Sequence, residues 1–185
     1  MKLSRQALEV VASEWIDCAM QSDLEPALLK FEHIVQVNDP GDERLTTISR
    51  HQLWQGLVLR ARNPDKFIRG LQCESQTPDN NEFLRRTRAG DSNFCEKVTL
   101  YPQKEIHTQT LPDHNQIEAV STTRIEEPEP GYLFVRFNYQ RELEVTTEAV
   151  DVAEHLKAAY VQVDRDAIAM IRMLAQSRLF DGSIN

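Results

Sequence analysis

Alternating apolar and polar positions dominate the middle of the chain and predict a series of β-strands. The clearest run is 132–141, in which Leu133, Val135, Phe137 and Tyr139 share one face. The turns between the runs are too short for crossover connections, so the strands are expected to form an antiparallel meander. Five further runs precede the clearest one and end at Gly, Pro, Asn or Asp residues: 71–77, 83–89, 94–101, 104–110 and 116–125.

A seventh alternating run lies earlier in the chain, at 31–37. Phe31, His33, Val35 and Val37 share one of its faces, and the turn-forming residues that follow end it. Helical sequence separates this run from the other strands, and we expect it to join the sheet at an edge.

Helical spacing of apolar residues predicts a helix at 48–62, which begins with a capping box of Ser49 and Gln52. Asn63 then caps a second, short helix whose first residue is Pro64. A long helix is expected from Thr147, its cap, to about residue 177. Its apolar stripe is predicted to consist of Val152, Leu156, Ala159, Val163, Met170 and Leu174.

An amphipathic helix is also predicted at 3–22. We favour a helix that packs on its own domain; the alternative is a dimerisation or docking helix, which would allow a homodimer. The expected organisation is therefore an N-terminal helical extension, 1–25, followed by a single domain, 30–180.

This order of elements predicts an α+β fold, in which a curved antiparallel sheet of six or seven strands wraps around the long C-terminal helix. The two short helices are expected to close one end. Helix and sheet surfaces do not match along their whole length, so a cavity is expected between them.

Sequence motifs in this region resemble those of the AtaL-like family, within the START-like (SRPBCC) superfamily. The first motif consists of Gln52-Leu53-Trp54-Gln55-Gly56-Leu57, Arg60, Asn63-Pro64 and Phe67. Two later segments agree with it, 96–102 and 133–139, and the resemblance covers about residues 31–174. It implies the helix-grip fold of birch-pollen-allergen type, with an internal hydrophobic cavity. It implies no established activity, so function has to be argued from the site.

Charge and composition exclude several classes of partner. The 185 residues carry 21 basic and 29 acidic side chains, a net charge of −8. The basic residues form only one short run, Arg85, Arg86 and Arg88, so nucleic acid is not an expected partner. No apolar run approaches the length of a membrane span, and no membrane insertion is expected. Three widely spaced cysteines and the absence of a signal-peptide pattern indicate a cytoplasmic protein.

No motif of a nucleophile, phosphate loop or metal site is present, so no catalytic residue, metal or cofactor is assigned. His33 is either a hydrogen-bonded core histidine or a polar group in the cavity. Ser121 and Thr123 either line the cavity or face solvent. The candidate ligand-binding residues are His33, Val35, Trp54, Phe67, Phe94, Val98, Ser121, Phe137, Tyr139, Leu156 and Val163.

The leading hypothesis is a non-catalytic carrier or sensor of a small hydrophobic molecule, bound between the sheet and the C-terminal helix. One alternative is an enzyme of the polyketide cyclase or aromatase type, with His33 and Tyr139 as its acid–base groups. Another is a protein-interaction module that uses the N-terminal helix.

Overall fold

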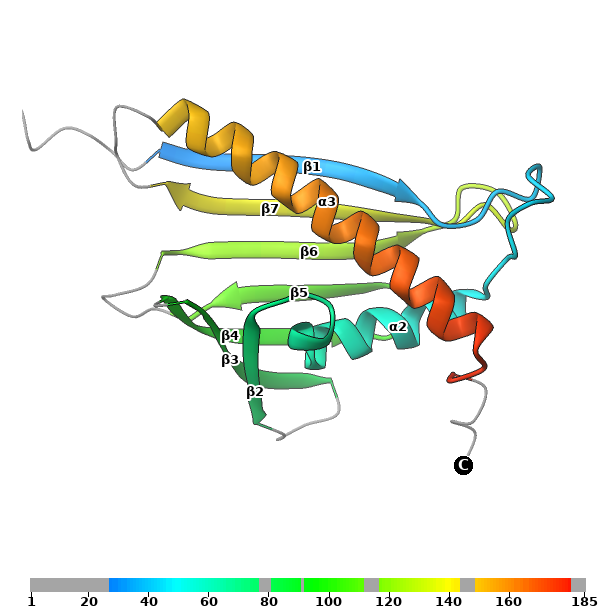
Figure 1. Ribbon diagram of the computed structural model, residues 1–185, viewed down its shortest axis with the longest axis horizontal. Coiled ribbons are helices and arrows are strands. Elements are labelled where there is room, and N and C mark those ends of the chain that lie inside the picture. The colour runs from blue at the N-terminus through cyan, green and yellow to red at the C-terminus, as the bar shows by residue number, and fades with distance from the viewer. Residues whose placement is uncertain (1–26, 77–80, 91, 112–116, 144–148, 181–185) are drawn as a thin grey trace, which may run out of the picture.

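A seven-stranded antiparallel sheet crossed by one long helix forms the body of the computed structural model (Figure 1). The structure describes residues 27–76, 81–90, 92–111, 117–143 and 149–180. The strands are β1 (Ala27–Gln36), β2 (Leu71–Gln76), β3 (Glu82–Ala89), β4 (Ser92–Tyr101), β5 (Glu105–Thr110), β6 (Ala119–Glu126) and β7 (Phe134–Leu143). Their order across the sheet is β1-β7-β6-β5-β4-β3-β2. The predicted meander is therefore confirmed, and β1 pairs with β7 at an edge.

The helices are α2 (Arg50–Arg62), the 3-10 helix η1 (Pro64–Lys66) and α3 (Ala149–Gln176). The capping box is confirmed, since the Ser49 hydroxyl accepts from the Gln52 backbone N–H and Gln52 Oε1 accepts from the Ser49 backbone N–H. Asn63 precedes η1 but makes no side-chain cap; its amide donates instead to the Leu59 carbonyl at 3.5 Å. The predicted helix 3–22, the extension 1–25 and the cap Thr147 lie outside the described residues.

The strand register separates an inner sheet face, toward α3, from an outer one. On the inner face Phe137 of β7 lies opposite His33 of β1 and Thr123 of β6. On the outer face Arg136 pairs with Glu126 at 2.6 Å and with Glu32. Charged side chains thus bridge three neighbouring strands where the sheet meets water, and the apolar side chains point the other way.

Helix α3 lies diagonally across the inner face, from above β1 to the side of α2 (Figure 1). Its buried side chains are Asp164, Ala167, Ile168, Ile171 and Ala175. The predicted apolar stripe is wrong at Val152, which is 44% exposed, and at Ala159, which is also exposed. The buried face of α3 is shifted by about one residue relative to the predicted stripe. It includes a carboxylate and two alanines, Asp164, Ala167 and Ala175, which a search for large apolar side chains does not select.

The helices α2 and α3 approach each other closely at Gly56. A Cβ atom at this position would lie 2.4 Å from Cγ2 of Ile171, so only glycine fits without a shift of the neighbouring helix. Together the two helices cover the end of the sheet near Ile125 and Val135, which belong to the buried hydrophobic cluster. No helix among the described residues is long and apolar enough to span a bilayer.

Candidate functional site

A cavity of about 360 Å³ lies on the inner sheet face, beside the buried cluster. The end of α2 and η1 form one wall, and Tyr160 of α3 contributes to another. Apolar side chains from both sides reach it, including Leu57, Ile68, Phe94 and Ile106. A concave, largely apolar space of this size is typical of a small-molecule site.

The floor of the cavity is polar. Thr108 and Thr110 of β5 and Ser121 and Thr123 of β6 line it, on the sheet face that elsewhere carries large apolar residues. Thr108 lies directly opposite Ser121 in the register, and Ser121 lies opposite Tyr139. Three hydroxyl groups therefore form a row across neighbouring strands.

Three of the candidate ligand-binding residues line this cavity: Phe94, Ser121 and Tyr139. The structure places the other eight outside its lining. Trp54, Val98 and Phe137 are buried in the main cluster, and Val35 and Phe67 pack against it. The remaining three are the half-buried His33, Leu156 and Val163.

A fully buried carboxylate, Asp164, connects the cavity wall to the core. Its Oδ1 accepts from Arg60 Nη2 at 2.5 Å, and its Oδ2 accepts from the Tyr139 hydroxyl at 2.7 Å. His33 Nε2 lies 2.7 Å from the same Oδ2. Four elements, α2, α3, β1 and β7, thus supply one hydrogen-bond network, as a buried charge requires.

This network keeps two of its members, Tyr139 and Arg60, protonated. Burial, reinforced by the charge of Asp164, raises the pKa of Tyr139 far above its ordinary value, so the phenol stays protonated and donates to the carboxylate. Burial opposes the charge of Arg60, but Asp164 outweighs it and raises the pKa of that guanidinium. The half-buried His33 stacks on Phe137, with ring centroids 5.2 Å apart, in addition to its hydrogen bond with Asp164.

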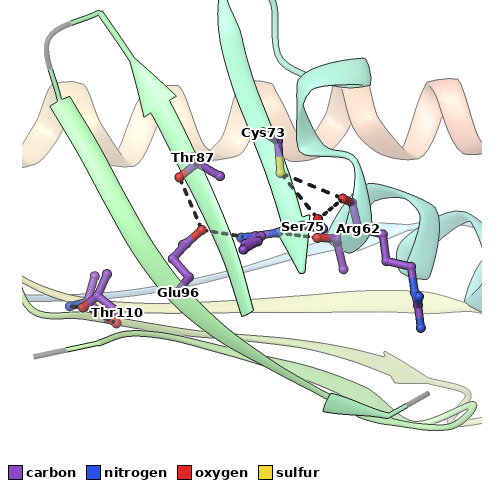
Figure 2. A network of polar contacts seen from close by, with 9 residues as sticks. Arg62, Cys73, Ser75, Thr87, Glu96 and Thr110 are labelled. Carbon is purple, nitrogen blue, oxygen red and sulfur yellow. Dashed lines mark hydrogen bonds and ion pairs between the residues drawn. The ribbon is translucent and has the colours of Figure 1, made fainter. Parts of the chain in front are cut away.

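A second polar network borders the cavity on the side of β3 and β4 (Figure 2). Arg85 donates from Nε to Glu96 Oε2 at 2.7 Å and from Nη1 to the Ala61 carbonyl at 2.6 Å. Thr87 lies beside the same carboxylate oxygen, at 3.4 Å. The Arg85–Glu96 pair therefore joins two strands of the sheet to the end of α2.

The edge strand β2 is attached to α2 in the same region. The Ser75 hydroxyl donates to the Arg62 carbonyl at 2.8 Å, and the Cys73 thiol lies 3.9 Å from that oxygen (Figure 2). Burial raises the pKa of the Cys73 thiol, which keeps it protonated and weakly nucleophilic. These contacts hold the wall of the cavity in place rather than supply chemistry.

Five residues of these networks and of the cavity lining have no role that the sequence motifs predict: Asp164, Arg60, Arg85, Glu96 and Arg141. For Asp164 a local signal exists, because it lies four residues after Tyr160 and four before Ile168, on the buried helix face. The arginines can be recognised as part of the site only when the topology of the sheet is known. Across the described ranges, no three His, Cys, Asp or Glu side chains converge on a point where a metal ion would fit.

Known sequences and structures resemble this chain. A family model described as "AtaL: Acetylaranotin biosynthesis cluster protein L" matches residues 33–178. A search of curated proteins found no match.

Among solved structures, the Zhui aromatase/cyclase from Streptomyces sp. R1128 is 12% identical, with a TM-score of 0.59 over 83% of this chain and 96% of that one. A point mutant of Thalictrum norcoclaurine synthase is 12% identical, with a TM-score of 0.58 over 83% and 99%. Human STARD10 is 8% identical, with a TM-score of 0.61 over 87% and 70%. At these identities the similarity shows the fold alone, which is the helix-grip fold.

Proposed function

The chain belongs to the AtaL family, and on that premise we propose that it binds a small, largely apolar molecule in the cavity between its sheet and its helices. The cavity is the observation that carries the proposal. Its volume of about 360 Å³ matches that of small-molecule sites. Phe94, Ser121 and Tyr139 are the predicted ligand-binding residues that can contact the ligand directly. We propose a cytoplasmic carrier or sensor, in line with the composition.

The hydrophobic probe N-phenyl-1-naphthylamine, whose fluorescence rises in apolar surroundings, tests this proposal. We expect saturable binding by the wild-type chain. Thr108→Phe fills the cavity and is expected to weaken binding at least about tenfold. Gln109→Phe is the matched control, because Gln109 is the next residue of β5, is exposed and faces away from the cavity. Equal affinity of the two variants would place the probe elsewhere and contradict the proposal.

A second candidate function, a cyclase-like enzyme, is supported by the hydrogen-bond network that reaches the cavity through Arg60 and Tyr139. A charged guanidinium beside an apolar space can stabilise a developing oxyanion. The solved structures with this fold include an aromatase/cyclase and norcoclaurine synthase. The two functions can be distinguished by letting the protein bind a molecule and then recovering that molecule. A carrier releases it with unchanged mass, whereas an enzyme releases a product.

A further inference from the structure

The lining of the cavity is positively charged although the chain as a whole is negative. Arg60, Arg85 and Arg141 all line it, in a protein of net charge −8. Arg60 is neutralised by Asp164, and Arg85 is neutralised by Glu96. The two carboxylates are therefore already engaged, and Arg141 is left as the surplus charge of the site.

Arg141 has no anionic partner among the residues that the structure describes. It lies on the inner face of β7, opposite Ala119 of β6 and Leu29 of β1, and both of these neighbours are uncharged. Its Nε atom is buried and makes no hydrogen bond within the described ranges. A buried hydrogen-bond donor that belongs to a charged side chain lowers stability when it remains unpaired. A ligand that supplies an acceptor to Arg141 Nε would therefore gain affinity.

Two hydroxyl groups in the same cavity lining as Arg141 are also available to a ligand. Thr108 and Ser121 face each other across β5 and β6, and neither hydroxyl has a hydrogen-bond partner among the described residues. Thr110 is different, because its hydroxyl accepts from the Ala119 backbone N–H at 2.8 Å. Arg141, Thr108 and Ser121 are thus polar groups of the cavity that a ligand can engage, beside apolar walls.

We propose that Arg141 binds the acid group of the ligand, so that the cavity selects an oxygenated organic monoacid over a neutral hydrocarbon-like molecule. The carboxylate pairs with the Arg141 guanidinium, the favoured partner of planar anions. The apolar body lies against Phe94 and Ile106, and oxygen substituents reach Thr108 and Ser121. One surplus cation matches one negative charge, so a dianion is disfavoured.

This inference rests on the proposed function and deepens it, and a pair of probes separates the two. 8-Anilinonaphthalene-1-sulfonate and N-phenyl-1-naphthylamine share one aromatic frame, and only the first carries an anionic group. Arg141→Gln is expected to weaken binding of the sulfonate at least about tenfold, as the loss of a charged hydrogen bond implies, and to change binding of the neutral probe less than about twofold. Arg141→Lys is expected to restore part of the sulfonate affinity.

Arg86→Gln is the matched control, because Arg86 is exposed on the outer face of β3, and it should leave both probes unaffected. Equal loss of both probes in Arg141→Gln would show a merely structural role and overturn the inference, as would no loss of either. Failure of the proposed function looks different: the neutral probe would then be indifferent to Thr108→Phe in the wild-type background. Thermal unfolding of each variant confirms that it is folded when it is measured.

Discussion

The two ends of the inner sheet face differ although the same strands form both. At the packed end, defined by Ile125 and Val135, both side chains are buried. At the hollow end, defined by Thr110, Ala119 and Arg141, the same strands line the cavity. Along β6 the inner face changes from Ile125 through threonine and serine to alanine. Helix and sheet geometry are shared, so side-chain size and polarity decide where the cavity forms.

The helices follow the same division. Ile168, Ile171 and Ala175 of α3 are buried at the packed end, where the missing side chain of Gly56 lets α2 approach. Toward its N-terminus α3 presents Tyr160, which stacks on Tyr139 with ring centroids 4.0 Å apart. Asp164 lies between these parts of α3. The boundary of the cavity is therefore a polar network rather than an apolar contact.

The largest expected contrast is between two phenylalanines. Phe137 is fully buried, so Phe137→Ala should cost about 3–5 kcal/mol of unfolding free energy, as removal of a packed aromatic side chain does. Phe94 borders space that is already empty, so Phe94→Ala should cost only about 1 kcal/mol. Denaturant unfolding measures both changes in free energy, provided that the two variants have equal m-values. A Phe94 cost as large as that of Phe137 would show that the two ends are packed alike.

Stability at alkaline pH tests the boundary between the two ends, through Tyr139. The unfolded chain releases this phenolic proton near pH 10, whereas the folded chain retains it, because burial and Asp164 raise the pKa of Tyr139. The stabilising effect is complete below pH 10 and is lost as the pH rises, by up to about 1.4 kcal/mol per pH unit. Between pH 9 and 11 the unfolding free energy should therefore decline less steeply in Tyr139→Phe than in the wild-type chain. Parallel declines would mean that water reaches the phenol in the folded state.

Local features of this fold could be predicted from sequence, and long-range ones could not. The capping box at Ser49 and the alternation along 132–141 depend on neighbouring residues, and both are found in the structure. The partners of Asp164 lie 25, 104 and 131 positions away, so no window of sequence contains them. For Ser121 and Thr123 the sequence alone leaves two places open, the cavity lining or the solvent-facing surface. Their place at the cavity became clear only with the pairing of β5 and β6.

The smallest expected effect concerns the hydroxyl row on the cavity floor. Thr108→Val keeps the shape of the side chain and removes a hydroxyl that has no partner among the described residues, so the unfolding free energy should change by less than about 0.5 kcal/mol. Thr110→Val is its control in the same strand. It removes an acceptor of the Ala119 backbone N–H and should cost about 1–2 kcal/mol. Because the Thr108 hydroxyl faces the cavity, its loss should strengthen binding of N-phenyl-1-naphthylamine while stability stays constant. A stability loss equal to that of Thr110→Val would show that Thr108 supports the sheet and is not held available for a ligand.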